Sequence, residues 1–527
     1  MKVLVSDSVA AEAIEKLKAI EGIEVDYAPD LKPDALKPHL ADAEGLVVRS
    51  STKVTAGLIA AAPRLRVVVR AGVGVDNVDV AAASRRGIIV LNTPGGNTLS
   101  TAEHTMALLL ALSRNVYRAC RSLKDGKWDR KSFMGTQLAG KTIGVFGLGR
   151  IGLEVARRAA AFGMTVLGVD PYVTPERAKQ HQASLVSDPA EVYARADYIT
   201  VHVPVTDETK GMIGAAQFAQ MKDGVKVINC ARGGIIDEAA LAAAIRGGKV
   251  AGAALDVFEE EPPTNRDLIE LDQVLCTPHL GASTEEAQLS VALEAAEIVA
   301  DALLHGRIRN AVNVPAIDPA EADALAPYTV LARCLGLLQT QLLRRIPSRV
   351  NITFAGEAAK LNARYVTAHL LAGLLDPVLD EEINFINAPW LAEERGIRVT
   401  ESRTPHTQEF ATLLSVTCYL DGQAHEAAGT LVGKGDPRIV LIDGYRVEAI
   451  PRGALLVIFA EDKPGLIGSV GHLLGERGIN IAAMTFGRKS AGGEAITVLN
   501  LDAAVDEATL AAVAAAPHVR EAQVVEF

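Results

Sequence analysis

The chain has few aromatic residues, few cysteines and no excess of positive charge. Its 527 residues include 4% aromatics and five cysteines, and the formal net charge is -11. A nucleic-acid partner requires a basic face, so the acidic balance argues against one. The cysteines are scattered, without a C-x-x-C pair or a Cys/His cluster. We therefore expect no disulfide framework and no metal site, and a cytoplasmic location fits this pattern.

Long apolar runs are also missing. The longest, such as MALLLAL at 106–112, is far shorter than the roughly 20 residues of a membrane helix. The first residues, MKVLVSDSVAAEA, carry Asp7 where a signal peptide needs an apolar core, so they predict a strand that leads into a helix. We expect no membrane partner. The length predicts three or four domains, and 49% hydrophobic with 22% charged residues is typical of globular proteins.

The first 280 residues alternate short runs rich in β-branched residues with longer Ala-rich stretches. This alternation predicts βαβ units and parallel sheets, with strands buried on both faces. The expected strands are 2–5, 45–49, 66–71, 88–92, 142–146, 165–170, 198–203, 225–229, 250–257 and 274–278.

Two long helices are predicted as connections between domains. One runs from Ser100 to Leu123, and Ser100 with Glu103 matches a capping box. The second opens at Ser283-Thr284, carries two glutamates in its first turn and ends at His305-Gly306.

The texture changes from about residue 316. Residues 322–450 mix a Leu-rich helix with strands and carry no recognisable chemical motif. The last stretch, from residue 454, has the order βαββαβ, which is typical of a ferredoxin-like domain.

A dinucleotide-binding fingerprint follows the strand KTIGVF. GLGRIG matches G-x-G-x-x-G, with Gly147 for the tight turn, Gly149 for approach to a pyrophosphate and Gly152 for helix packing. The next strand ends in Asp170, whose carboxylate can bind a ribose 2′-hydroxyl and would repel a 2′-phosphate. The motif alone is weak in a chain with 45 glycines, but this context favours NAD over NADP.

The fingerprint begins late, so the first hundred residues belong to another domain. We predict a nucleotide domain inserted into a substrate domain, with the active cleft between them. The predicted boundaries are 1–98 with 284–316 for the substrate domain, 99–283 for the NAD domain, 317–452 for an intervening α+β domain and 453–527 for a C-terminal domain.

Ligands of open α/β sheets bind outside the carboxyl ends of the strands. Several polar residues lie at or after the carboxyl ends of predicted strands: Arg49, Ser50, Arg70, Asn97, Arg232, Asp256 and His279. Each arginine alone is more often a solvated loop cation, and His279 alone is more often an ordinary turn histidine. Together they predict one cleft, in which Arg232 can grip a carboxylate. Glu261 of VFEEEPP could orient the ring of His279 for acid/base chemistry.

The ordered motifs GLGRIG…D, INCARGGIID, LDVFEEEPP and TPHLGAS resemble those of the D-isomer-specific 2-hydroxyacid dehydrogenases. With RAGVGVDNVD, NTPGGNT and the C-terminal domain, the whole chain resembles the long-form D-3-phosphoglycerate dehydrogenase family. The resemblance implies two Rossmann-like domains, an intervening domain and a terminal ACT domain. It also implies NAD-dependent oxidation of 3-phosphoglycerate to 3-phosphohydroxypyruvate, the first step of serine biosynthesis, by a homotetramer.

The resemblance assigns residues to each role. The catalytic set falls on Arg232, Glu261 and His279. The other expected contacts are Gly147, Gly149, Arg150, Ile151, Gly152, Asp170, Thr206, Cys230, Ala231, Asp256, Gly281 and Ala282 for the cofactor, Arg49, Ser50, Arg70, Gly72, Asn97 and Lys131 for the substrate, and Asp462 and Asn480 for L-serine as effector. Arg130 and Lys131 could come from a neighbouring subunit.

Two other functions are compatible with the same scaffold. A dehydrogenase for an unphosphorylated 2-hydroxy acid would not need Arg49 and Arg70 together, and it gives no reason for an ACT domain. A non-enzymatic NAD sensor would tolerate the loss of His279 and Glu261, yet both are present.

Overall fold

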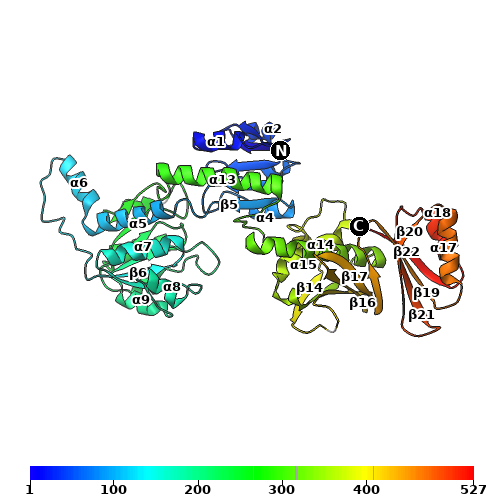
Figure 1. Cartoon of the computed structure of the whole chain (residues 1–527). Coiled ribbons are helices and arrows are strands. Elements are labelled where there is room, and N and C mark those ends of the chain that lie inside the picture. Colours follow the sequence, from blue (N-terminus) through cyan, green and yellow to red (C-terminus); the bar gives the residue numbers. More distant parts are fainter. Residues whose placement is uncertain (265, 315–318, 408) are drawn as a thin grey trace.

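The computed structural model describes residues 1–264, 266–314, 319–407 and 409–527 (Figure 1). Four sheets follow one another along the chain, two of them parallel, one mixed and one antiparallel. The predicted fold class is confirmed, with two parallel α/β sheets, an α+β domain and a C-terminal βαββαβ unit. The predicted boundary between residues 316 and 317 lies outside the described residues.

The first domain is a five-stranded parallel sheet. Its strands are β1 (Lys2–Val5), β2 (Glu24–Tyr27), β3 (Gly45–Val48), β4 (Val67–Arg70) and β5 (Ile89–Asn92), in the order β2-β1-β3-β4-β5. Its helices are α1 (Ala11–Lys18), α2 (Pro33–Leu40), α3 (Ala56–Ala60), α4 (Val80–Arg85) and the late helix α13 (Glu285–His305). The strand order reverses between β1 and β3, which makes their carboxyl ends a natural binding edge.

The second domain is a seven-stranded parallel sheet. Its strands are β6 (Thr142–Phe146), β7 (Thr165–Val169), β8 (Ser184–Leu185), β9 (Tyr198–Val201), β10 (Val225–Asn229), β11 (Val250–Leu255) and β12 (Val274–Cys276), in the order β12-β11-β10-β9-β6-β7-β8. Its helices are α5 (Thr98–Ser113), α6 (Val116–Lys124), α7 (Arg150–Ala161), α8 (Pro175–Gln180), α9 (Pro189–Arg195), α10 (Ala215–Gln220), α11 (Glu238–Arg246) and α12 (Arg266–Ile269). The order reverses between β6 and β9, beside the glycine-rich turn.

The helices α5 and α13 carry the chain out of the first domain and back. The predicted start of α13 is confirmed, because Thr284 caps it by accepting from the Ala287 amide at 3.2 Å. The predicted capping box of α5 is wrong. That helix begins at Thr98, and Ser100 instead hydrogen-bonds Thr284 at 2.7 Å, which ties the two helix starts together.

The single helix expected over 100–123 is also wrong. It is broken into α5 and α6 at Asn115, whose φ is 51°. Asparagine is one of the few residues that adopts this left-handed conformation at low cost. The break turns α6 away from the second domain as an arm (Figure 1).

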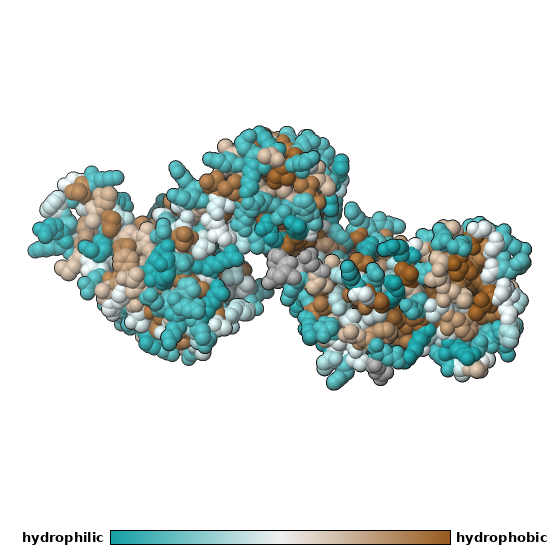
Figure 2. All heavy atoms as spheres, viewed as in Figure 1, coloured by the Kyte–Doolittle hydropathy of each residue, from teal (hydrophilic) through white to brown (hydrophobic). Residues whose placement is uncertain are grey.

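The α6 arm, residues 116–134, is exposed and partly apolar. No residue of α6 is buried, and the side chains of Trp128 and Met134 are 81% and 84% exposed. Apolar and polar side chains lie side by side on this arm in Figure 2. None of the helices among the described residues combines the length and apolar character of a membrane span.

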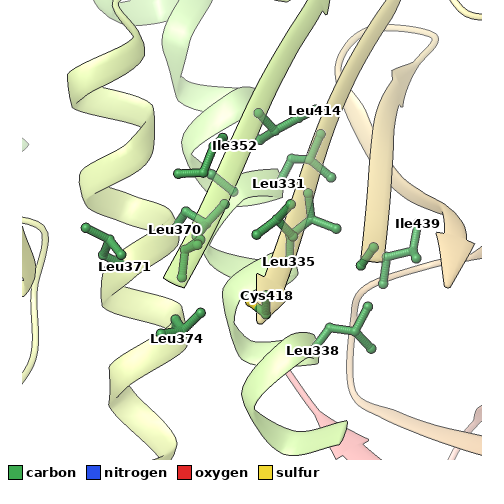
Figure 3. Close-up of a cluster of buried hydrophobic side chains, with 14 of the residues drawn as sticks. Leu331, Leu335, Leu338, Ile352, Leu370, Leu371, Leu374, Leu414, Cys418 and Ile439 are labelled. Atoms are coloured by element: carbon green, nitrogen blue, oxygen red, sulfur yellow. The ribbon is translucent and has the colours of Figure 1, made fainter. Parts of the chain in front are cut away.

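The intervening domain packs three α-helices against a mixed sheet. Its strands are β13 (Arg349–Gly356), β14 (Arg398–Thr404), β15 (Thr412–Leu420), β16 (Gln423–Val432), β17 (Asp436–Ile442) and β18 (Tyr445–Ala449), in the order β14-β13-β15-β16-β17-β18. Its α-helices are α14 (Pro319–Leu343), α15 (Ala363–Leu375) and α16 (Ala388–Glu394). Two short 3-10 helices, η1 (Glu357–Lys360) and η2 (Asp376–Val378), connect these elements. Leucines of α14 and α15 meet Ile352 and Leu414 of the sheet (Figure 3).

The C-terminal domain is an antiparallel sheet with two helices. It contains β19 (Ala454–Glu461), α17 (Leu466–Glu476), β20 (Ile481–Arg488), β21 (Glu494–Leu501), α18 (Glu507–Ala514) and β22 (Val519–Glu526), with the strand order β20-β21-β19-β22. One face of the sheet packs on α17 and α18. The other face, through Leu455, Val457 and Val525, joins the core of the intervening domain. The two domains therefore share one hydrophobic core.

Candidate active site

A cavity of about 490 Å³ lies between the first and second domains, at the carboxyl ends of their strands. It is lined by Val73, Gly74, Val75, Asp76, Asn92, Pro94, Asn97, Thr101, Gly149, Arg150, Ile151, His202, Val203, Pro204, Val205, Cys230, Ala231, Arg232, Asp256, His279, Gly281, Ala282 and Val312. Eleven of the predicted site residues are in this set, contributed by segments from both domains.

The glycine-rich turn has the geometry that a dinucleotide requires. Gly147 has φ 91°, and a Cβ placed on it would lie 2.5 Å from His202 O. A Cβ on Gly152 would lie 1.9 Å from Gly147 O, so the helix and the turn can pack only around glycine. By contrast, a Cβ on Gly149 would meet no atom within 4 Å. The space above Gly149 opens into the cavity and leaves room for a ligand beside the turn.

The start of α7 supports the same assignment. Gly149 is the N-cap, and no side chain caps the helix. Its first-turn amides and helix dipole therefore favour an anion, as in other dinucleotide sites. Asp170 lies at the end of β7 and accepts hydrogen bonds from the Leu148 and Tyr172 amides, both at 2.8 Å. These contacts hold the carboxylate beside the glycine-rich turn, where a ribose would lie.

His279 and Glu261 form a hydrogen-bonded pair. His279 Nδ1 lies 2.7 Å from Glu261 Oε2, and Glu261 Oε1 accepts from the Phe258 amide at 3.2 Å. Burial alone would raise the pKa of the Glu261 carboxyl, but the hydrogen bond and charge of His279 outweigh it, so the pKa lies below its ordinary value. The carboxylate therefore stays ionised and fixes the ring through Nδ1, which leaves Nε2 to exchange a proton.

The backbone of His279 is held in an uncommon conformation. Its φ is 54°, which costs a non-glycine residue about 1–2 kcal/mol. The His279 amide donates to Asp256 O at 2.9 Å. Strain of this kind persists only where the surroundings determine it, and it is concentrated at functional sites.

Asp256 organises the loop that carries His279. Its carboxylate accepts from the Leu280 amide at 2.7 Å, the Gly281 amide at 2.8 Å and the Thr277 hydroxyl at 2.6 Å. His104 Nε2 of α5 lies 3.2 Å away. Burial would raise the pKa of Asp256, but hydrogen bonds from His104, Thr277 and the Leu280 amide outweigh it and hold the pKa low. With four partners, the carboxylate has little capacity left for the predicted cofactor contact.

Arg232 is presented by a turn that Asn229 clamps. Asn229 is buried at the end of β10, where its side chain accepts from the Ala231 amide at 3.0 Å and donates to Arg232 O at 2.8 Å. Cys230, in the same turn, is buried, and burial raises the pKa of its thiol to about 12. The thiol therefore stays protonated and does not act as a nucleophile.

The first domain contributes Asn97 to the cavity lining, whereas Arg49 and Arg70 are not among the lining residues. Arg70 Nε and Asn97 Oδ1 are buried without a hydrogen-bond partner among the residues that the structure describes. Such atoms are rare and mark places where a ligand or water completes the bonding. The predicted Gly72 lies against the Arg70 guanidinium, since a Cβ on it would meet Arg70 Nη1. Asp7 holds the turn that carries Arg49 and Ser50 by accepting from the Arg49 amide at 2.6 Å.

Some predicted residues do not reach the cavity within one chain. Thr206 is exposed and bonded to its own turn, although the preceding residues 202–205 line the cavity. Lys131 is exposed in the loop after α6 and is absent from the lining. The signals for Thr206 and Lys131 came from the resemblance alone.

The two predicted effector residues lie at opposite ends of β21. Asp462 accepts from Arg488 at 2.8 Å and from the Gly492 amide at 3.0 Å, next to the start of the strand. Asn480 donates to Asp502, beyond the end of the strand. Eight residues of strand separate them by about 24 Å. A single chain therefore does not bring Asp462 and Asn480 together around one small effector, and their role in binding L-serine stays a prediction.

Sequence reasoning did not find four of the groups that build the site. Asn229 and His104 act through hydrogen bonds, His202 lines the cavity beside the glycine-rich turn, and Asp76 pairs with Arg232 at 3.1 Å. Position after a strand could have suggested Asn229 and His202. Nothing in the local sequence distinguishes His104 or Asp76.

Three family models match the chain. The D-isomer specific 2-hydroxyacid dehydrogenase NAD binding domain matches residues 106–281, the D-3-phosphoglycerate dehydrogenase intervening domain matches 324–443, and the ACT domain matches 454–518.

Proteins of similar sequence and structure agree with these matches. D-3-phosphoglycerate dehydrogenases of Archaeoglobus fulgidus and Methanocaldococcus jannaschii are 47% and 45% identical, the first over 95% of both chains and the second over 100% of both. The crystal structure of a D-lactate dehydrogenase from Aquifex aeolicus with NAD and lactic acid matches with a TM-score of 0.52 and 29% identity, over 60% of this chain and all of that one. TT0316 protein from Thermus thermophilus has a TM-score of 0.54 and 36% identity, over 59% of this chain and all of its own.

The relatives match nearly the whole chain at 45–47% identity, and the site contains the glycine-rich turn and the His279–Glu261 pair. The protein is therefore an NAD-dependent oxidoreductase. The chain belongs to the D-3-phosphoglycerate dehydrogenase family, within the D-isomer-specific 2-hydroxyacid dehydrogenases.

Proposed function

We propose that this protein oxidises 3-phosphoglycerate to 3-phosphohydroxypyruvate with NAD, the first step of serine biosynthesis. The observation that carries the proposal is the His279–Glu261 pair at 2.7 Å, on the rim of a cavity that Arg232 and the glycine-rich turn also line. An acid/base pair, a carboxylate-binding cation and a dinucleotide turn are the groups that hydride abstraction from a 2-hydroxy acid needs.

The proposed chemistry divides between His279 and its partners. When bound, NAD supplies the nicotinamide that accepts a hydride from C2. His279 Nε2 takes the C2 hydroxyl proton as the hydride leaves, so both electrons of the C–H bond depart and a C=O bond forms. Glu261 stabilises the imidazolium that results. Asp256 keeps the His279 loop in its strained conformation through the Leu280 and Gly281 amides.

Arg232 binds the substrate carboxylate in this proposal and polarises the C2 oxygen. Arg49 and Arg70 of the first domain receive the phosphate. Burial and then the charge of Arg232 lower the pKa of Arg70 to about 10, and Arg49 lowers it further in the same direction. Three neighbouring arginines favour a ligand with two anionic groups over one with a single carboxylate. Asn97, with its unpaired Oδ1, can accept from a substrate hydroxyl.

The proposal is tested by NADH formation, followed by absorbance, with 3-phosphoglycerate, D-glycerate and D-lactate. We expect kcat/KM for 3-phosphoglycerate to exceed that for the other two by at least about 100-fold, because two arginines would lose their partner. Equal rates with D-glycerate would favour an unphosphorylated 2-hydroxy acid as the substrate.

We also propose that the chain forms a homotetramer in the cytoplasm, and that the α6 arm covers a second copy and brings Arg130 and Lys131 to its phosphate site. The exposed Trp128 and Met134 on this arm support an interface. Light scattering after gel filtration should give about four times the 55.5 kDa of one chain. A mass of one chain would exclude the arrangement.

We further propose that L-serine binds between two C-terminal domains. Asp462 and Asn480 lie at opposite ends of β21, so only a neighbouring chain can bring one of each together. Asp462→Ala and Asn480→Ala should each abolish inhibition by serine. Mixed assemblies of the two variants contain some intact sites, so they should regain part of the inhibition. No recovery in the mixture would contradict a site shared between chains.

A further inference from the structure

An ion pair across the cleft engages Arg232, the arginine proposed to bind the substrate carboxylate. Arg232 Nε donates to Asp76 Oδ2 at 3.1 Å. Arg232 follows β10 of the second domain, whereas Asp76 lies in the loop between β4 and α4 of the first domain. The arginine assigned to the substrate carboxylate is therefore already bound by a carboxylate of the chain itself.

The packing around Gly74 brings the two side chains together. A Cβ on Gly74 would lie 1.8 Å from Arg232 Nη2 and 2.6 Å from Asp76 Oδ2. Arg232 Nη1 donates to Ala231 O at 2.6 Å. Nε has a single N–H, so the Nε/Nη2 edge of the guanidinium is engaged by Asp76. A substrate carboxylate that binds both nitrogens of this edge must displace Asp76.

Asp76 is the partner that can leave. Its side chain is 71% exposed, whereas Ala231 O is fixed in the backbone turn that Asn229 clamps. Asp7, the other carboxylate near these arginines, is occupied by the amides of Arg49, Ser51 and Thr52. Asp76 therefore pairs with Arg232 through a bond between two side chains, which is more easily exchanged than a set of bonds to the backbone.

We propose that Asp76 is an internal competitor for the substrate carboxylate. It holds the Arg232 guanidinium in the cleft when the site is empty, and it gives the guanidinium up when the substrate binds. Its negative charge also repels the two anionic groups of the substrate, so Asp76 raises KM for the substrate. The same charge weakens the binding of other anions to the cleft. The inference rests on the proposed role of Arg232 in binding a carboxylate.

The test is Asp76→Asn, which keeps the shape of the side chain and removes its charge. The loss of a competing exposed ion pair and of like-charge repulsion should lower KM for 3-phosphoglycerate about two- to tenfold. The change in kcat should be smaller than the change in KM, and the Kd of NADH should stay the same. A purely structural defect would weaken NADH binding as well.

Asp79→Asn is a matched control. Asp79 lies three residues further along and caps α4 by accepting from the Ala82 amide at 2.9 Å. Asparagine caps helices as well as aspartate does. The control removes the same charge from the same loop without touching Arg232, so its KM should equal that of the unaltered protein. An unchanged or raised KM in Asp76→Asn would overturn the proposal.

A second measurement separates this inference from the choice of substrate. Oxamate is a small carboxylate without a phosphate, and its Kd for the NADH-loaded protein can be measured by calorimetry. Asp76→Asn should bind it about two- to tenfold more tightly, whichever 2-hydroxy acid is the substrate. Tighter oxamate binding without oxidation of 3-phosphoglycerate by the unaltered protein would refute the proposed substrate and leave the role of Asp76 intact. Equal or weaker binding, or none to either protein, would overturn that role.

Discussion

Alanine at Gly149 and alanine at Gly152 should have opposite consequences, although the two glycines belong to one turn. Gly149 has φ −68° and ψ −164°, which alanine can adopt, and an added Cβ meets no atom within 4 Å. At Gly152 the added Cβ would lie 1.9 Å from Gly147 O. The first substitution adds a methyl group to the ligand space, and the second adds one to the protein interior.

The magnitudes follow from these surroundings. Gly149→Ala should leave stability unchanged or raise it by up to about 1 kcal/mol, because alanine restricts the unfolded chain. Its methyl group takes the space of the pyrophosphate, so the Kd of NADH should rise at least about tenfold, or about 1.4 kcal/mol. Gly152→Ala should cost about 1–3 kcal/mol through overpacking, which corresponds to a melting temperature lower by several degrees.

Thermal unfolding and fluorescence titration with NADH measure the two effects separately. The reasoning requires that Gly149→Ala loses cofactor affinity while its melting temperature stays at or above that of the unaltered protein. NADH binding of ordinary strength in Gly149→Ala would show that no pyrophosphate passes over this glycine. A melting temperature lowered as in Gly152→Ala would show that the space above Gly149 is not open.

Three further predictions concern His279, Glu261 and Asp256. His279→Ala should lower kcat about 10²–10⁴-fold with the Kd of NADH retained, and near-normal turnover would exclude the acid/base role. Because the pKa of Glu261 lies below its ordinary value of 4.5, its ionised form stabilises the folded state above that pH, and this stabilisation is lost as the pH falls through the lowered pKa. Urea titrations should therefore show Glu261→Gln less stable than the unaltered protein at neutral pH, with a difference that shrinks below pH 4.5; a difference independent of pH would contradict this. Asp256→Asn replaces an acceptor of two amides by a group that can accept with one atom only, so it should lower kcat more than it weakens NADH binding, and an unchanged kcat would remove Asp256 from the support of His279.

The features that were predictable from the sequence are those written in adjacent residues. The turn GLGRIG and Asp170 follow successive strands, so their proximity depends only on a βαβ unit. The caps of α13 are similarly local, since Thr284 and Gly306 stand directly at its ends. Position after a strand was also enough to bring Arg232 and His279 to one cavity.

The unpredicted features depend on residues far apart in the chain. Asp76 and Arg232 are 156 positions apart, and His104 and Asp256 are 152 apart. Their meeting depends on how two domains and a connecting helix pack, and no periodicity encodes that. For Asp256, the sequence predicted the position but not the hydrogen-bond partners. The hydrogen bonds of Asp256 go to backbone amides whose directions are fixed by the fold alone.

The break of the long helix at Asn115 was missed because the surrounding residues favour helix and neither glycine nor proline marks the turn. The shared core of the last two domains did leave a signal. The strand LLVIFA of β19 is apolar at successive positions, which is typical of burial on both faces rather than one.

That shared core limits how evolution or engineering can rearrange this protein. Leu455, Val457 and Val525 are fully buried against the intervening domain, so a shortened chain ending near residue 452 would leave apolar side chains of the intervening domain in water. Deletion of the C-terminal domain should therefore expose this apolar surface and favour aggregation. The two domains should instead be gained, lost or transplanted as one unit of about 200 residues.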